Sequence, residues 1–110
     1  MYERTREFMS FDIAGFSHWY GAECLGELKA GTRLKLTAEP DNPYDPNAVM
    51  LSYKGTKLGY VPRAINYELS QLMFFGHGDV FKAVVTQVDP EAHPEHQVRV
   101  MVLVKDKRTK

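Results

Sequence analysis

Short segments in which apolar and polar side chains alternate recur along this chain, and turn residues separate them. In the last such segment, 97–105, the valines at positions 98, 100, 102 and 104 all fall on one face. A period of two residues is typical of a half-buried β-strand. The same reasoning predicts strands at 7–14, 32–40, 48–53, 56–61 and 79–88, with a hairpin turn at 54–55. The chain is therefore predicted to be mainly β.

One segment has the period of a helix instead. Apolar side chains recur every three to four residues at Ile65, Leu69, Leu72 and Met73, and Gly76 follows as a stop signal. This predicts one main helix at about 63–75. Six short strands and one helix favour a small antiparallel barrel of OB-like or SH3-like character, because closure removes exposed strand edges. A doubly wound parallel sheet is excluded, since it needs a helix for each strand pair.

Length and composition fit one globular domain. The chain has 110 residues, of which 44% are apolar, enough for a single core without disulfides or metals. We expect one domain over 1–110, with its core at about 8–105 and a flexible basic tail at 106–110. Cys24 is the single cysteine, so no internal disulfide is possible. The sequence shows no signal peptide and no apolar run of membrane-spanning length. This predicts a cytoplasmic protein without membrane contact, with association with the nucleoid as the second option.

The charge balance limits the kinds of partner. Lys plus Arg and Asp plus Glu both number 14, which gives a formal net charge of zero. Proteins that hold duplex nucleic acid by bulk charge are usually basic. A ligand that contacts the protein through only one or two phosphates stays compatible with this composition.

The segment 39–51, EPDNPYDPNAVML, is stiffer than a plain turn requires. Pro43 and Pro46 fix their own φ angles and push Asn42 and Asp45 toward extended conformations. Tyr44 and Asp45 are thus expected on a backbone with few alternatives, which suits a site that holds an aromatic face and an acceptor in set positions. From residue types alone, a rigid connection capped by Asn and Asp side chains is the more common explanation.

Aromatic side chains gather in the loop GFSHWYG, between Gly15 and Gly21. His18, Trp19 and Tyr20 could offer stacking faces to nucleobases. The alternative is that these rings close the mouth of the barrel, and burial preferences favour a core position for Trp19.

Two cations flank an aromatic side chain near the end of the fourth predicted strand. Lys57 and Arg63 lie on either side of Tyr60 in the sequence, and cations beside a ring suit the phosphates and bases of a nucleic-acid strand. In isolation, a solvated strand edge with protective charges is the simpler explanation.

Metal and enzyme interpretations find less support. The candidate zinc ligands are His77, Glu91, His93, Glu95 and His96. A structural zinc site usually includes several cysteines, and Cys24 has no second cysteine to act with, so a solvated loop is favoured and no cofactor is assigned. The sequence contains no Walker loop, GxSxG or HExxH motif, so no catalytic activity is predicted, and a metal-dependent hydrolase built on these histidines and carboxylates is the least favoured alternative. Asp41 with Asp45 stays open as an acid–base or metal pair.

Three motifs stand in order: IAGFSHWYG at 13–21, EPDNPYDPNAV at 39–49 and KLGYVPR at 57–63. Together they resemble the HIRAN domain family, from about residue 8 to residue 105, and the second motif is the most specific. The resemblance implies a small OB-like or SH3-like β-barrel with packed helices. Members occur fused to Swi/Snf-type ATPases that remodel stalled replication forks, and as short bacterial proteins, which this chain is similar to. The ATPase activity belongs to domains that are not seen in this sequence.

The resemblance also implies a ligand. In the best-understood member, the domain captures the free 3′ end of single-stranded DNA. By that resemblance, Tyr44 would stack on the terminal base and Asp45 would accept a hydrogen bond from the 3′-hydroxyl. Asn42 would line the pocket and His18 would stack on or bond a base. Tyr60 and Arg63 would contact the phosphate backbone. Trp19 and Lys57 are further candidates for nucleic-acid contact from the residue pattern alone.

Two positions depart from the family pattern. Ser17 stands where that member has an arginine, and His18 stands where it has a tyrosine. A cationic contact is therefore missing, which implies weaker affinity or a different ligand end.

An alternative function is a protein-interaction module that uses Phe74 and Phe75 at the end of the helix, with repair or replication proteins as partners. We expect a monomer or a weak oligomer.

Overall fold

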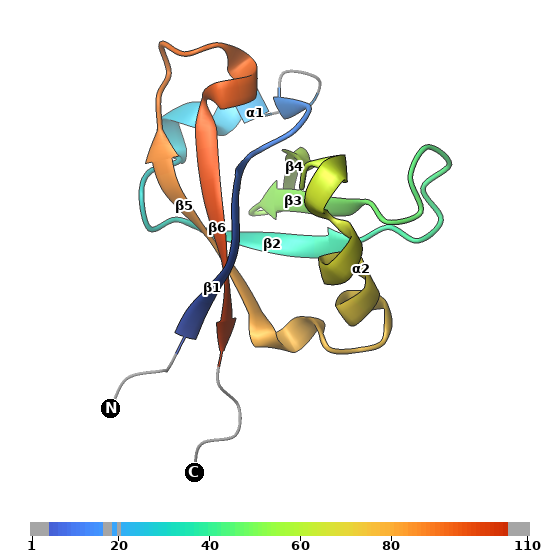
Figure 1. The fold of residues 1–110 in the computed structure, drawn as a ribbon. Coiled ribbons are helices and arrows are strands. Elements are labelled where there is room, and N and C mark those ends of the chain that lie inside the picture. Colours follow the sequence, from blue (N-terminus) through green and yellow to red (C-terminus); the bar gives the residue numbers. More distant parts are fainter. Residues whose placement is uncertain (1–4, 17–18, 20, 106–110) are drawn as a thin grey trace.

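The structure is a computed structural model that describes residues 5–16, 19 and 21–105. It contains a six-stranded sheet in which all pairings are antiparallel, as Figure 1 shows. The strands are β1 (Thr5–Asp12), β2 (Arg33–Ala38), β3 (Val49–Tyr53), β4 (Thr56–Tyr60), β5 (Phe81–Val88) and β6 (Val98–Lys105). Their order in the sheet is β1-β6-β5-β2-β3-β4. The predicted fold class, mainly β with a packed helix, is confirmed.

The sheet curls into a barrel that stays partly open, because no ladder of paired residues joins its two outer strands in the described part of the chain. β1 and β4 are its two outer strands. They approach each other at one isolated bridge just after β1, where Ala14 N donates to Tyr60 O and Tyr60 N donates to Ala14 O, both at 2.9 Å. The predicted barrel therefore needs a correction. Among the described residues, a single backbone-paired couple of residues joins the two outer strands, because β1 leaves its ladder with β6 at Asp12.

Gly59 makes this closure possible. Its φ angle is 153°, and a Cβ atom there would lie 2.5 Å from Ala14 O and 2.6 Å from Ile13 Cγ2. Only glycine avoids both the clash and the backbone strain. The backbone of β4 can thus approach the segment after β1 closely.

The core lies between the strands and repeats the alternation seen in the sequence. Val98, Val100 and Val102 of β6 are buried, and Val100 pairs with Val85 of β5 in the sheet register. The valine at position 104, predicted on the same face, is only half-buried because it lies near the open end of the strand. Period two therefore identified the core strands correctly.

The main helix is shorter than predicted. α2 spans Tyr67–Phe74, and a 3-10 turn at Arg63–Ile65 precedes it. Leu69 is buried and Met73 packs against the core, but Ile65 and Leu72 are exposed, so their assignment to the apolar face was wrong. Ile65 lies in the 3-10 turn and outside the helical phase, while the two-turn helix buries only a narrow stripe that excludes Leu72.

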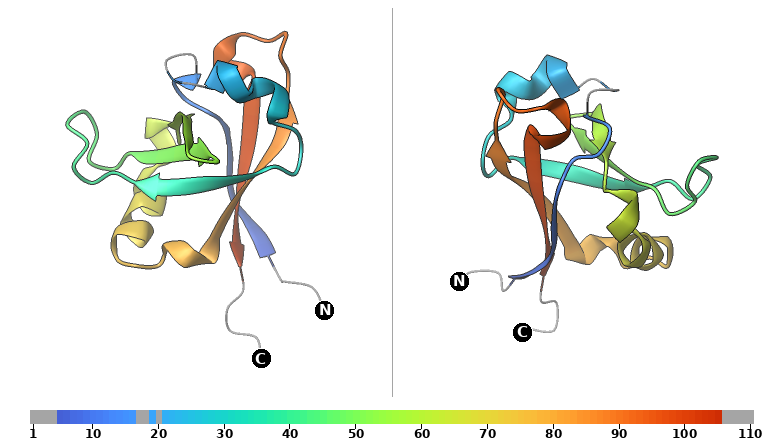
Figure 2. Two further views of the ribbon diagram at one scale, coloured as in Figure 1. Left: turned by 180° about the vertical axis from the view of Figure 1, so that it is seen from behind. Right: turned by 45° about the horizontal axis from the view of Figure 1, so that its top comes forward.

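The other helical segments are brief. They are α1 (Gly21–Cys24) and 3-10 turns at Leu25–Glu27, Gly78–Val80 and Pro94–His96. In the part of the chain that the structure describes, no helix combines the length and the hydropathy needed to cross a membrane. The loop 39–48 projects from one side of the sheet, away from the start of β1 and the end of β6, as both views of Figure 2 show.

Candidate functional site

The loop 39–48 is held by the side chain of one of its own residues. Asn42 Oδ1 accepts hydrogen bonds from Tyr44 N at 2.8 Å and from Asp45 N at 3.1 Å. Asn42 Nδ2 donates to Glu39 Oε1 at 3.0 Å. An Asx side chain that bonds the backbone ahead of it fixes a turn, so the capped-loop explanation of this segment is correct. It does not exclude a binding role, because the cap sets how the next two residues are presented.

Tyr44 is the most exposed large hydrophobic side chain among the described residues. Its exposed fraction is 84%, although Tyr side chains usually bury much of their ring. Pro43 and Pro46 on either side restrict the backbone that carries it. A rigid backbone that presents an exposed ring is a stacking surface with little conformational entropy to lose.

Asp45 is held in place on both oxygens. Oδ1 accepts from Asn47 N at 2.9 Å and Oδ2 accepts from Asn66 Nδ2 at 2.9 Å. Asn66 is itself buried, so the carboxylate has a fixed orientation. Each carboxylate oxygen can accept more than one hydrogen bond, and the Asp45 side chain is still 16% exposed. An acceptor site toward solvent therefore persists.

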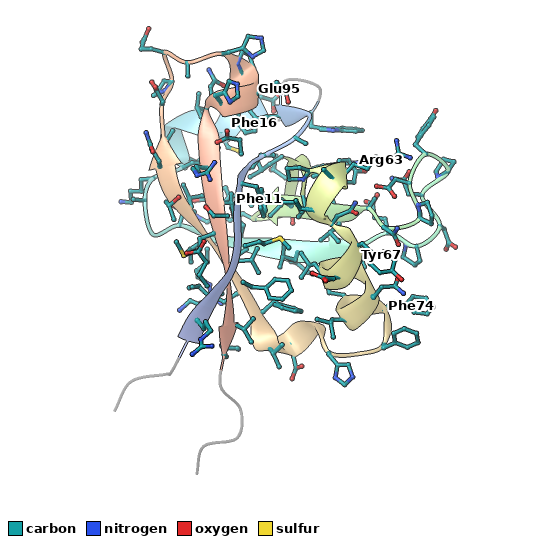
Figure 3. The ribbon with its side chains drawn as sticks, viewed as in Figure 1. Phe11, Phe16, Arg63, Tyr67, Phe74 and Glu95 are labelled. Atoms are coloured by element: carbon teal, nitrogen blue, oxygen red, sulfur yellow. The ribbon has the colours of Figure 1, made fainter. Side chains whose placement is uncertain are left out.

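Arg63 crosses from the start of the helical region to this loop, as Figure 3 shows. One guanidinium nitrogen donates to Tyr44 O at 2.7 Å, and Nε lies 3.8 Å from Asp45 Oδ2. The second distance is too long for a hydrogen bond, and the Arg63 side chain is 75% exposed, so water screens the pair. The guanidinium thus offsets the Asp45 charge in part without occupying its oxygens. It also clamps the backbone that carries Tyr44.

A second cluster of rings and charges lies at the end of β4. Lys57 Nζ is 3.6 Å from the centroid of the Trp19 ring and 2.6 Å from Tyr60 Oη. Tyr60 Oη donates in turn to Glu39 Oε1 at 2.8 Å. The two rings meet edge to face, with centroids 6.3 Å apart. Glu39 therefore connects this cluster with the Asn42 cap.

Trp19 is not a core residue. Its side chain is 39% exposed, whereas Phe16 is almost fully buried and fills the barrel interior at that point. The expectation of a buried Trp19 is therefore wrong. The larger indole stays outside because the smaller Phe16 ring already occupies the core and Lys57 covers the indole face.

A pocket of about 340 Å³ joins the two clusters. Six of the predicted site residues line it, namely Trp19, Asn42, Tyr44, Asp45, Tyr60 and Arg63. Lys57 contacts two of them from behind. The predictions for Ser17, His18 and Tyr20 fall on positions outside the described residues. The sequence reasoning missed Glu39 and Asn66, which position the site; an Asn directly before the helix was the available signal for the latter.

Side chains of the histidine-rich connection, 89–96, bond to other groups of the protein. His96 Nδ1 lies 3.1 Å from Asp12 Oδ2, and His93 Nδ1 accepts from Glu95 N at 3.2 Å. Glu95, labelled in Figure 3, accepts a bond from Gly15 N at 3.4 Å. Within the described ranges, no three His, Cys, Asp or Glu side chains lie close enough to hold a metal ion. These residues do not fit a tetrahedral zinc site.

Cys24 lies in the core rather than at the pocket. The side chain is buried beside the apolar cluster. Burial raises the pKa of the Cys24 thiol, and the carboxylates of Glu27 and Glu23 raise it further. A thiol that keeps its proton is a poor nucleophile.

The sequence and the fold both match known proteins. The family model described as HIRAN domain matches residues 7–105. A crystal structure of a Lactobacillus plantarum protein has a TM-score of 0.78 at 23% identity, covering 96% of this chain and 99% of that chain. The HIRAN domain of human HLTF has a TM-score of 0.62 at 16% identity, covering 94% of this chain and 82% of that chain. No curated protein matches the sequence.

The structural likenesses show a shared fold, and the family match spans the strands and the loop that build the pocket. The three motifs that suggested the resemblance lie around this pocket, in the segment after β1, the loop 39–48 and the end of β4. The chain therefore belongs to the HIRAN domain family.

Proposed function

We propose that this chain binds the free 3′ end of single-stranded DNA in the pocket between Tyr44 and Tyr60. The supporting observation is that the exposed ring of Tyr44 and the oriented carboxylate of Asp45 line one pocket and are set by one Asn42 cap. In the family resemblance these are the positions for the terminal base and the terminal hydroxyl. The setting is DNA repair or replication-fork processing.

The terminal base stacks on Tyr44. Base–aromatic stacking contributes about 1–3 kcal/mol per base. The ring is exposed before binding, and the prolines beside it limit the entropy that ordering costs. The pocket wall of Ala48 and Val61 gives the base an apolar edge to contact.

The 3′-hydroxyl donates a hydrogen bond to a free lone pair of Asp45. An internal nucleotide has no such donor, because its 3′ oxygen is esterified. A hydrogen bond to a charged acceptor contributes about 1.5–3 kcal/mol. Asn66 and Asn47 N hold the carboxylate for this contact, so no reorganisation is needed on binding.

Arg63 changes the expected discrimination. Its guanidinium lies beside Asp45 and would tolerate a 3′-phosphate better than a bare carboxylate would. The preference for a hydroxyl end then comes from the hydrogen bond to Asp45 more than from repulsion. We therefore expect about tenfold tighter binding to a 3′-hydroxyl than to a 3′-phosphate, the lower end of that bond's range.

Fluorescence anisotropy with 5′-labelled oligonucleotides tests this function. The parent protein is titrated with matched 3′-hydroxyl and 3′-phosphate strands. We expect Asp45→Ala to erase the preference and Tyr44→Ala to weaken binding of both strands. Tyr67→Ala is the matched control, because Tyr67 is an exposed ring outside the pocket. Equal affinity of the parent for both strands, or no binding to either, contradicts end recognition.

Asp45→Ala also removes a bond to the buried Asn66, so loss of folding must be separated from loss of recognition. Asp45→Asn removes the charge and leaves one carbonyl oxygen, which can take the place of one of the two oxygens that accept from Asn47 N and Asn66 Nδ2. We expect it to fold with the parent's thermal unfolding midpoint within a few degrees and to lose most of the preference. A folded Asp45→Asn variant with full preference would remove the carboxylate from the site.

A protein-interaction role is a second candidate, favoured by one observation. Phe74 and Phe75 are both exposed at the end of α2, and their rings meet edge to face with centroids 5.1 Å apart. They line a hollow of about 220 Å³ beside Pro40 and Pro46. A partner that is captured after nuclease treatment by the parent, and not by Phe74→Ser/Phe75→Ser, would favour this role over DNA binding.

A further inference from the structure

The outer face of β2, β3 and β4 carries a second, larger groove. It encloses about 540 Å³ and runs beside the hairpin turn at 54–55. Its charged lining residues are Arg33, Lys35, Lys54 and Lys57. Among the described residues that line it, none is acidic. A chain with zero net charge thus concentrates four positive charges on one surface.

The sheet register explains why these cations share one face. Lys35 of β2 is opposite Ser52 of β3, and Ser52 is opposite Lys57 of β4. Side chains that lie opposite each other across strands point the same way, so Lys35 and Lys57 stand on one side of the sheet, about 10 Å apart across two strand spacings. Arg33 precedes Lys35 by two residues and points to the same face.

Three of these cations lack a counter-charge within the described part of the chain. Arg33, Lys35 and Lys54 make no ion pair there, whereas Arg63 and Arg99 both face aspartates. Unpaired cations in a groove raise the local concentration of an anionic ligand. A flexible chain of phosphates carries the charge that such a groove would attract.

One side chain, that of Lys57, links the groove to the end-binding pocket. Lys57 lines the groove, and its Nζ contacts both the Trp19 ring and Tyr60 Oη. Those two rings line the pocket. A strand that leaves the pocket past Trp19 and Tyr60 therefore meets Lys57 first and the other three cations next.

We propose that this groove binds the phosphodiester backbone of the same single strand, on the 5′ side of the end that the pocket holds. The path across the face rests on the proposed function, but the affinity of the groove for a phosphate chain does not. The cations contact phosphates and read no bases, so this part of the interface is independent of sequence.

A length series tests the groove. Strands of two to ten nucleotides, all with a 3′-hydroxyl, are titrated with the parent and with Lys35→Gln/Lys54→Gln. We expect parent affinity to rise at least tenfold with length, and the variant to lose most of that gain while it binds the dinucleotide unchanged. Two phosphate contacts fewer should lower the slope of log K against log salt by about 1.4, at about 0.7 for each contact to a single strand.

Arg6→Gln/Lys105→Gln is the charge-matched control. These residues lie on β1 and β6, at the end of the sheet from which the termini leave. We expect this variant to keep the parent's length dependence and salt slope. An equal loss in both variants would mean that only net charge matters and would overturn the groove.

The remaining outcomes separate the groove from the pocket. A parent that prefers a 3′-hydroxyl end but gains nothing with length retains the pocket and overturns the groove. A gain with length that needs Lys35 and Lys54, without any preference for the end, retains the groove and overturns the pocket. Competition by polyglutamate of equal charge as strong as that by the oligonucleotide would assign the groove to an acidic protein instead, and would overturn the nucleic-acid assignment.

Discussion

Two halves of this barrel are built in different ways. The sheet half β1–β6–β5 is held by long ladders and buried valines, with few exposed rings. The half β2–β3–β4, with the loop 39–48, presents the exposed ring of Tyr44 and the half-buried ring of Tyr60. Hydrogen bonds between polar side chains connect its segments. The buried valine core and the proposed binding site thus lie in different regions, so a substitution in one half should leave the property of the other half unchanged.

The junction between the halves is narrow. β2 and β5 share two registered pairs, at Arg33 with Val84 and at Leu34 with Ala83. On the other side, the bridge between Ala14 and Tyr60 is the one backbone pairing, among the described residues, that joins the segment after β1 to β4, and Trp19 packs against Lys57 and Tyr60 beside it. Because few residue pairs join the two halves, we expect a substitution in the junction to lower both the stability and the oligonucleotide affinity.

Gly59→Ala attacks this junction and should have the largest effect. The new Cβ would meet Ala14 O at 2.5 Å in a backbone conformation that side chains rarely adopt. Backbone strain and overpacking each contribute about 1–3 kcal/mol, so we expect the free energy of unfolding to fall by about 2–6 kcal/mol. Urea unfolding followed by fluorescence measures the loss.

Gly26→Ala is the matched control for Gly59. No atom lies within 4 Å of the added Cβ, and we expect a change within about 0.5 kcal/mol. If Gly59→Ala were as mild as this control, the bridge to Ala14 would not determine how the barrel closes.

The second effect separates the two halves. Val100→Ala removes buried methyl groups from β6 and should lower the free energy of unfolding by about 1.5–3 kcal/mol, while the folded fraction keeps the parent's oligonucleotide affinity. Tyr44→Ala should do the reverse, with stability within about 0.5 kcal/mol of the parent and affinity weaker by about 1–3 kcal/mol. A binding defect in folded Val100→Ala would show that the halves are coupled.

The half β1–β6–β5 could be predicted from the sequence because its buried side chains recur at every second position. Alternating valines in 97–105 identify a strand and its buried face, and the core of β6 confirms them. The closure of the barrel could not be predicted in this way. It depends on the approach of Gly59 to Ala14, a contact between distant segments that leaves only an isolated glycine as its signal.

The site could be predicted only in part. The prolines around Tyr44 signalled a rigid, exposed ring, and the structure agrees. The carboxylate of Asp45 is oriented by Asn66, which lies 21 positions away and is buried. Polar partners of this kind follow no period, so composition and spacing do not reveal them. The predicted burial of Trp19 was wrong for a related reason. Average burial preferences describe single residue types and do not take into account that Phe16 already fills this part of the core.

Cys24 is expected to give the smallest effect in the comparison of the core with the proposed binding site. Its titratable thiol lies in the core and not at that site. Its pKa is raised above the ordinary value of 9.0, mainly by burial. Below pH 9 the thiol keeps its proton in both the folded and the unfolded chain, so it adds no pH dependence. Above that pH the unfolded chain releases the proton first, and stability falls by up to about 1.4 kcal/mol per pH unit until the folded pKa is reached.

Other groups titrate at the same pH, so the measurement is a difference between two proteins. Urea unfolding of the parent and of Cys24→Ala is compared at pH 8, 9 and 10. The variant should be less stable by a constant amount up to pH 9, because it loses packing, and this deficit should shrink at pH 10 as the parent loses its thiol contribution. A deficit that stays constant over the whole range would mean that Cys24 is as accessible to water as it is in the unfolded chain, and that the core of this barrel opens near α1.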